Sequence, residues 1–376
     1  MMRHPGLSVG IGQNTLLKRF SFYMILSVLM LNAISLINLL SATTNIAKHL
    51  KGIFYSQIMW IVIGWALYWL LTFVSYRFFV RFAYVFYIVN IGALIAVMFI
   101  GKTSYGAQRW LNLGFFSYQP SETMKLAMIL VLAKYLSRFN PSDGIGFRNL
   151  FVPMLLAGIP FALTAKQPDL GTALLILAIS SSMILMMRVR MHVLVTGLCV
   201  ALVAGPLAWQ YGLKPYQKNR VLTFLYPNKD PRGAGYNSIQ AKIAVGSGQL
   251  WGKGFRNGSQ SQLEFLPEKQ TDFIFCVLSE EYGFLGCIAT LGIYAILLLA
   301  ILQCAMTAKD LYGALLSIGV FSLVIWHVFV NIGMVTGLLP IVGVPLPLIS
   351  YGGTSSMTIM VGLGWISSVF YRKDMF

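Results

Sequence analysis

Residues 20–40 have the sequence FSFYMILSVLMLNAISLINLL and contain no charged side chain. A helix that spans a bilayer needs about 20 mostly apolar residues. A transmembrane β-strand would instead alternate apolar and polar residues over a segment of about ten. This stretch is apolar on every face, so it predicts a transmembrane helix and excludes a β-barrel strand.

The same pattern recurs along the chain. Charge-free stretches cover residues 52–76, 82–101, 191–213, 282–308 and 311–371. Only 10% of the 376 residues are charged, against about 25% in soluble domains, and 57% are hydrophobic. The composition excludes a soluble globule, and we expect an all-α, polytopic integral membrane protein.

Charges and turn residues between the apolar runs predict ten membrane helices. Their expected ranges are 20–40, 56–74, 82–100, 122–137, 150–164, 170–187, 192–209, 282–306, 313–335 and 355–371. An even number of spans puts both termini on one side. Placing the termini in the cytoplasm leaves most Lys and Arg residues of the short loops inside, as the positive-inside rule requires. We therefore expect a multi-pass protein of the cytoplasmic membrane with both termini inside.

One segment, residues 210–271, is polar and rich in Gly, Pro and Asn. It is predicted to be a large extracytoplasmic loop within a single domain of residues 1–376, with a short interfacial helix near 236–245. The net charge of +17 is ascribed to membrane orientation, because no basic block supports nucleic-acid binding. The four cysteines show no Cys-x-x-Cys spacing, so neither a disulfide framework nor a zinc site is expected.

Acidic residues are the informative minority. Five of the eleven lie within residues 264–281, namely Glu264, Glu268, Asp272, Glu280 and Glu281. Ionisable groups at membrane depth are costly and usually functional. Asp272 stands where the polar loop enters an apolar span, which makes it a candidate base. The alternative is a charge at a helix N-terminus, favoured by the helix dipole.

Three further candidates precede the large loop. Glu122 and Lys125 are three residues apart and share a helix face, so they are either site residues or an internal ion pair. Arg109, beside Trp110, could equally be an interfacial anchor. Asp169 follows Gln-Pro and could simply cap the next helix.

These segments together resemble a known family. The motifs are GAQRW at 106–110, QPSE at 119–122 with Lys125, QPDLG at 167–171, GSQSQLEFLPEKQTDFIF at 258–275 and PLPLISYGG at 345–353. They are similar to the shape, elongation, division and sporulation (SEDS) family of bacterial cell-wall polymerases. The match spans nearly the whole chain and looks closer to the elongation branch, RodA, than to the division branch, FtsW. Lys269-Gln270 departs from the family pattern, which often has a His before the Thr-Asp pair.

The resemblance implies a peptidoglycan glycosyltransferase that joins the disaccharide units of lipid II on the outer face of the membrane during cell elongation. It implies a catalytic acid at Asp272. The residues expected to contact substrate are Arg109, Glu122, Lys125, Asp169, Arg220, Lys242, Glu264 and Glu268. A divalent cation, Mg²⁺ or Mn²⁺, could assist the cationic side chains.

The resemblance also implies protein partners, a class B penicillin-binding protein transpeptidase and the elongation machinery. Two other functions stay open at this point, a transporter that flips lipid II and a scaffold that recruits a transpeptidase. The clustering of acids at the outer boundary favours chemistry at the surface over transport.

Overall fold

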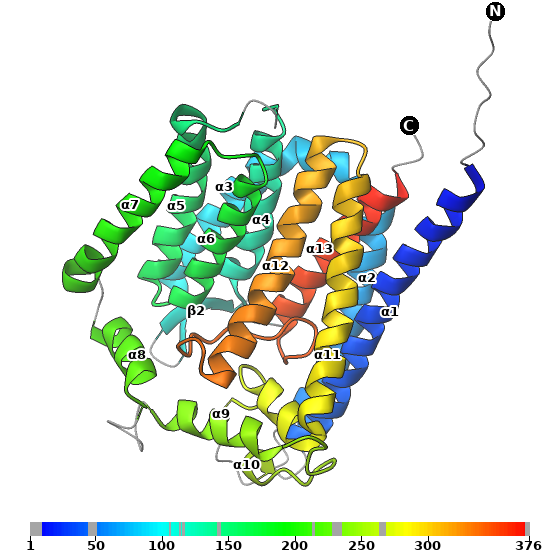
Figure 1. Ribbon diagram of the computed structural model, residues 1–376, viewed down its shortest axis with the longest axis vertical. Helices are drawn as coiled ribbons and strands as arrows, with labels where there is room; N and C mark the ends of the chain where they lie inside the picture. The colour runs from blue at the N-terminus through cyan, green and yellow to red at the C-terminus, as the bar shows by residue number, and fades with distance from the viewer. Residues whose placement is uncertain are drawn as a thin grey trace, which may run out of the picture.

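The computed structural model describes residues 10–43, 51–104, 107–112, 114, 117–140, 144–212, 215–227, 235–262 and 268–372. Most of these residues lie in long helices that run side by side across the molecule (Figure 1). The long helices are α1 (Gly10–Ala42), α2 (Lys51–Phe73), α3 (Tyr76–Ile100), α4 (Pro120–Leu136), α5 (Phe147–Lys166), α6 (Leu170–Leu185), α7 (Met191–Leu207), α11 (Ile274–Thr307), α12 (Leu311–Thr336) and α13 (Gly353–Tyr371). Each of the ten predicted spans corresponds to one of them.

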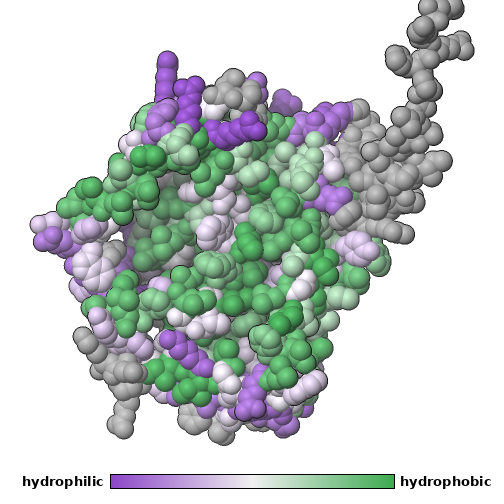
Figure 2. All heavy atoms as spheres, viewed as in Figure 1, coloured by the Kyte–Doolittle hydropathy of each residue, from purple (hydrophilic) through white to green (hydrophobic). Residues whose placement is uncertain are grey.

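The surface agrees with a membrane location. Apolar side chains form the middle of the face in Figure 2, and hydrophilic side chains gather at its upper and lower ends. Within the described residues, six helices are long and apolar enough to cross a bilayer, and α6 and α7 are shorter apolar helices. An apolar surface of this extent on a water-soluble protein would aggregate. The all-α membrane fold is therefore confirmed.

The first described helix begins, and the last one ends, on the side of the bundle opposite to the short helices between α7 and α11. The start of α1 and the end of α13 are at the top of Figure 1, whereas α9 (Tyr236–Ser247) and α10 (Ser259–Gln262) are at the bottom. A π-helical turn, η2 (Ala208–Gly212), and α8 (Pro215–Leu225) lead from α7 into this lower layer. Helix α9 confirms the short helix expected near 236–245.

A small sheet joins α3 to α4, in addition to the helices that the composition predicted. Strands β1 (Lys102–Ser104), β2 (Ala107–Asn112) and β3 (Ser117–Tyr118) pair antiparallel in the order β1-β2-β3. Strand β2 carries Arg109. The sheet contacts the ends of α3 and α4, so it holds this arginine against the bundle.

Helices α4 and α12 form the centre of the bundle. Helix α4 contacts α3, α5, α6, α12 and α13, and most of its side chains are buried. This position explains why α4 can contain charged residues at membrane depth. Its charges face other helices, where they find partners, rather than lipid.

Helix α11 is interrupted at Gly283, whose backbone is not helical (φ 66°, ψ −162°). The loop residues 249–254, which we call the splint, form backbone hydrogen bonds in place of the intrahelical hydrogen bonds that are missing at Gly283. Four backbone hydrogen bonds join splint and helix: Lys253 N to Glu280 O (3.0 Å), Gly254 N to Glu281 O (3.0 Å), Phe284 N to Gln249 O (2.8 Å) and Leu285 N to Leu250 O (3.2 Å). The predicted span began at 282, one residue before the interruption, whereas α11 begins at Ile274. The first turns of α11, from residue 274, belong to the outer layer.

Candidate active site

Asp272 lies on a turn immediately before α11, half-buried at the N-terminal end of that helix. The neighbouring backbone is held from two sides. Asn331 on α12 donates to the Asp272 carbonyl (3.0 Å), and Ser350, in the loop between α12 and α13, donates to the Thr271 carbonyl (2.6 Å). The carboxylate itself faces Gly343 of the same loop, since a Cβ atom at 343 would lie 3.2 Å from its Oδ2.

The surroundings adjust the acidity of this carboxyl. Burial raises the pKa of Asp272 to about 6, and the negative charges of Glu268 and Asp169 add to this rise. The positive charges of Arg109 and Arg220 act in the opposite direction and lower the pKa. A general base works best when its pKa is close to the operating pH. Asp272 therefore combines the position and the acidity of a base, and the four other charged residues are predicted site residues.

Arg109 and Asp169 form one side of this group. The Arg109 guanidinium lies 3.7 Å from an Asp169 oxygen and also donates to the carbonyls of Gln167 (3.4 Å) and Pro168. Asp169 accepts from the Thr172 amide (3.3 Å) as the N-cap of α6, which confirms the expected capping role. The pair thus connects the sheet to α6, and its side chains are 22% and 3% exposed.

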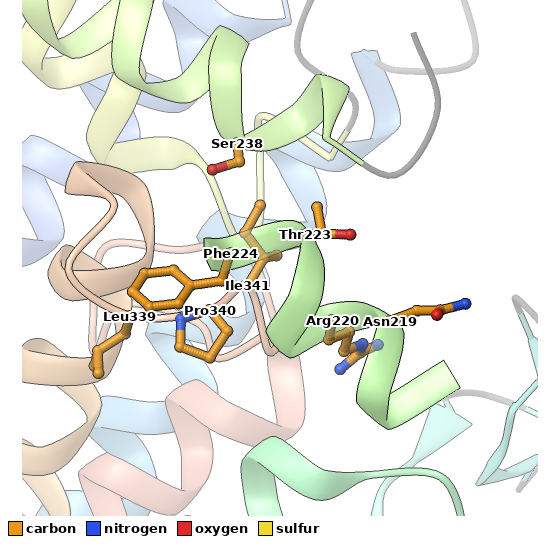
Figure 3. A pocket seen from close by; sticks show the side chains of 8 residues that line it. All are labelled: Asn219, Arg220, Thr223, Phe224, Ser238, Leu339, Pro340 and Ile341. Atoms are coloured by element: carbon orange, nitrogen blue, oxygen red, sulfur yellow. The ribbon is translucent and has the colours of Figure 1, made fainter. Parts of the chain in front are cut away.

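Arg220 lies on α8 at a cavity of about 210 Å³ between α8, α9 and the start of the loop after α12 (Figure 3). One part of the lining is apolar and the other polar; the lining residues are Asn219, Arg220, Thr223, Phe224, Ser238, Leu339, Pro340 and Ile341. Nη1 of Arg220 is buried and has no hydrogen-bond acceptor among the described residues. The cavity therefore offers a cationic donor to an anionic group, next to apolar surface.

Glu122 and Lys125 are enclosed in the bundle. The Lys125 ammonium lies 2.8 Å from Glu122 Oε1 and 2.7 Å from Nε2 of His327 on α12, and the three residues are between 1% and 4% exposed. This geometry favours the internal ion pair over contact with substrate. His327 is the partner that the sequence did not indicate, because a lone histidine in an apolar span usually only packs.

The remaining candidates are dispersed. Lys242 is exposed on α9, and its side chain crosses Gly337 at the C-terminal end of α12. Glu268 precedes Asp272 by four residues and accepts from the Thr271 hydroxyl (3.3 Å). Glu264 lies outside the described residues.

The acidic residues that lie close together in the sequence occupy different places in the structure. Glu280 is fully buried and accepts from Lys253 Nζ (2.8 Å) and from the amides of Gln260 (2.9 Å) and Ser261 (3.0 Å). Glu281 accepts from the Ser41 hydroxyl of α1. These two carboxylates hold the large loop and α1 against α11, so that of the described acids in 264–281 only Asp272 and Glu268 lie at the site, together with Asp169.

Comparisons with known proteins identify the family of this chain. Residues 19–374 match the FtsW, RodA and SpoVE family, described as cell cycle proteins. The peptidoglycan glycosyltransferase MrdB of Escherichia coli K12 is 44% identical over 291 residues, which cover 77% of this chain and 78% of MrdB. RodA of Treponema pallidum, also named a peptidoglycan glycosyltransferase, is 30% identical and covers 94% of this chain and 98% of its own.

Solved structures show the same fold. A chain from a study of how a peptidoglycan synthase complex coordinates polymerization and crosslinking superposes with a TM-score of 0.81 at 30% identity, over 94% of this chain and 98% of that one. The rod shape determining protein RodA of Thermus thermophilus gives a TM-score of 0.69 at 27% identity, over 93% and 96%. The chain therefore belongs to the FtsW, RodA and SpoVE family, the SEDS family that its sequence motifs indicate.

Proposed function

We propose that Asp272 is the general base with which this chain, a peptidoglycan glycosyltransferase of the elongation branch, joins the disaccharide units of lipid II. The observation that carries the proposal is a half-buried carboxyl at the N-terminal end of α11 that faces Gly343, with a pKa raised to about 6 and with the positive charges of Arg109 and Arg220 acting on it. The acceptor hydroxyl must lose its proton as it attacks the anomeric carbon of the donor. A carboxylate within hydrogen-bond reach takes that proton.

The reaction is a single displacement. The new glycosidic bond forms as the bond between the anomeric carbon and the pyrophosphate oxygen breaks, and undecaprenyl pyrophosphate leaves with the electron pair. An α-linked donor then gives a β-linked product by inversion, without an enzyme nucleophile. Pyrophosphate is a good leaving group, so the second carboxylic acid of glycosidases is dispensable.

Cations must stabilise the negative charge that develops on the leaving group. Arg220 is the first candidate, because it lines the cavity between α8 and α9 and its charge acts on Asp272. Arg109 is the second, although its contacts to Asp169 and two carbonyls already engage part of its guanidinium. Lys125 is not needed for this role, since Glu122 compensates its charge inside the bundle.

A divalent cation would require ligands from the substrate. In the described part of the chain, no three His, Cys, Asp or Glu side chains converge on one point. Mg²⁺ is commonly held by one or two carboxylates together with phosphate oxygens. Glu268 is the carboxylate that could hold such an ion while Asp272 binds the proton, and the ion would supply further charge neutralisation at the pyrophosphate.

We further propose how the bundle is oriented in the membrane and which protein it binds. With both termini in the cytoplasm, the layer of α8, α9 and α10 faces outside, where lipid-linked disaccharides are polymerised. A class B penicillin-binding protein is the proposed partner, because a similar chain functions in a complex that couples polymerization to crosslinking.

Asp272→Asn tests the mechanism. Asparagine has nearly the same shape but cannot take up the proton, so glycan polymerisation by purified protein in liposomes should be lost while labelled lipid II still binds. Asp272→Glu should retain little activity, because one methylene displaces the carboxylate. Asp310→Asn is the matched control, since it makes the same chemical change at the opposite end of α12, where Asn also caps well. Polymerisation by Asp272→Asn at the unmodified rate would show that the base is another residue.

A further inference from the structure

We infer that Asn331 and Ser350 are positioning residues that hold the turn carrying Asp272 against the loop between α12 and α13. This inference rests on the proposed function of Asp272. It concerns residues that contact the backbone of the catalytic turn and leave its carboxylate free for substrate.

Asn331 connects two segments with one side chain. It is fully buried near the outer end of α12, and its Nδ2 donates to the Asp272 carbonyl (3.0 Å) and to the Val344 carbonyl (2.7 Å). The amide thereby donates one hydrogen bond to each of two different loops. Loss of the amide would leave two carbonyls without this donor, in a site where burial makes an unmade bond costly.

One of the two segments that Asn331 joins carries the carboxylate, and the other faces it. Val344 follows Gly343, the residue that faces Asp272 Oδ2, and the φ of +74° at Gly343 favours glycine. Asn331 therefore sets the distance between the carboxylate and the opposite wall of the site. Substrate geometry depends on such distances, and a displacement of 1 Å can reduce a rate by about 10²-fold.

Ser350 holds the same turn from the other side. Its hydroxyl donates to the Thr271 carbonyl (2.6 Å) and accepts from the Leu346 amide (2.8 Å). The adjoining backbone is anchored to the first two helices, because Ser35 donates to the Ile349 carbonyl (2.7 Å) and Gln57 to the Ser350 carbonyl (3.5 Å). The turn is thus connected through Ser350 to α1 and α2.

Helix α12 is itself a rigid support for Asn331. His327 lies one turn earlier on the same face, four residues away, and contacts Lys125 of α4. Asn331 cannot shift along the bundle without breaking this buried contact. Contacts to the central helices therefore fix the position of Asp272, in addition to the contacts made by the outer loop.

The test compares kcat, KM and the pH profile of purified variants in liposomes. Asn331→Leu has similar volume and no donor, so kcat should fall about 10²-fold while KM for lipid II changes less than about 2-fold. Ser350→Ala should give a fall in the same direction, and Ser350→Thr, which keeps the hydroxyl, should recover most of it. Ser317→Ala on the same helix is the matched control, because Ser317 is also buried but bonds near the opposite end.

The pH profile separates positioning from general destabilisation. If the turn loosens, Asp272 gains access to water, its pKa falls from about 6, and the acid limb of kcat moves to lower pH. The charged groups that act on Asp272, namely Glu268, Asp169, Arg109 and Arg220, are unchanged in these variants. Ser317→Ala should leave the limb in place.

Several results would overturn the inference. One such result is a normal kcat with an unshifted acid limb of the pH profile in folded Asn331→Leu. Another is a loss of kcat in Asn331→Leu and Ser350→Ala that is fully explained by their loss of thermal stability. If Asn331→Leu does not fold, the kcat of Ser350→Ala compared with that of Ser350→Thr tests the inference instead. Unmodified activity of Asp272→Asn would instead refute the proposed function, so the two failures are distinguishable.

Discussion

Lys125 on α4 donates a hydrogen bond of 2.7 Å to Nε2 of His327 on α12. Nδ1 of His327 lies 2.6 Å from the Leu323 carbonyl, which can only accept, so Nδ1 carries the proton and Nε2 accepts. The ammonium also contacts Glu122 at 2.8 Å. A charge at the centre of the bundle is thus enclosed by an acid and a neutral imidazole, and this cluster connects the two central helices.

Lys125→Met should destabilise the protein before it affects chemistry. It removes the partner of the buried Glu122 carboxylate, and breaking a buried pair in this way costs about 3–5 kcal/mol. Thermal unfolding in detergent measures the loss, and Lys125→Met combined with Glu122→Gln should recover much of it. Unchanged thermal stability with loss of polymerisation would support the substrate-binding role instead.

The pH dependence of polymerisation should follow the ionisation of Asp272. A base must be unprotonated, so kcat should decline as the pH falls through about 6. Glu268→Gln removes a negative charge that raises this pKa, so the acid limb should move to lower pH. Arg109→Gln removes a positive charge that lowers the pKa, and its limb should move to higher pH. Shifts in the same direction would exclude Asp272 as the titrating group.

The orientation of the bundle can be measured by cysteine labelling. Asn257→Cys, on the outer loop, should react with an impermeant thiol reagent in intact cells, whereas Lys309→Cys, between α11 and α12, should be protected. Both are made in a chain whose four native cysteines are replaced. The reverse labelling pattern would put the proposed active site in the cytoplasm.

Gly283→Ala should lower the thermal stability. An added Cβ would overlap the backbone of the splint at Gly252, and the combination of φ +66° and ψ −162° is essentially restricted to glycine, which costs about 1–3 kcal/mol by itself for another residue. Gly292→Ala, farther along α11, has open space around its added Cβ and should be neutral or stabilising by up to about 1 kcal/mol. Equal effects of the two substitutions in thermal unfolding would contradict a specific requirement at 283.

The sequence predicted the ten helices because a bilayer imposes length and polarity on each of them. It placed the start of α11 too late, since Glu280 and Glu281 interrupt the apolar pattern. Their charge is accommodated by Lys253, backbone amides and Ser41, contacts that no local pattern contains.

The site was predictable in part for a similar reason. Asp272, Glu268, Asp169 and Arg109 stand in recognisable motifs, whereas Arg220, which also acts on the pKa of Asp272, lies outside them. Asn331 and His327 are isolated polar residues in an apolar run, and their partners lie 59 and 202 residues away. Lys242 is exposed on α9 beside the C-terminal end of α12, and its contact with substrate stays a prediction.

The interruption makes α11 dependent on another segment of the chain. Peptide groups without partners at membrane depth cost several kcal/mol each. The backbone groups beside Gly283 are hydrogen-bonded to the splint rather than within the helix. Helix α11 is therefore complete only when the splint lies against it. The two segments form one hydrogen-bonded unit, and the turn that carries Asp272 leads directly into it.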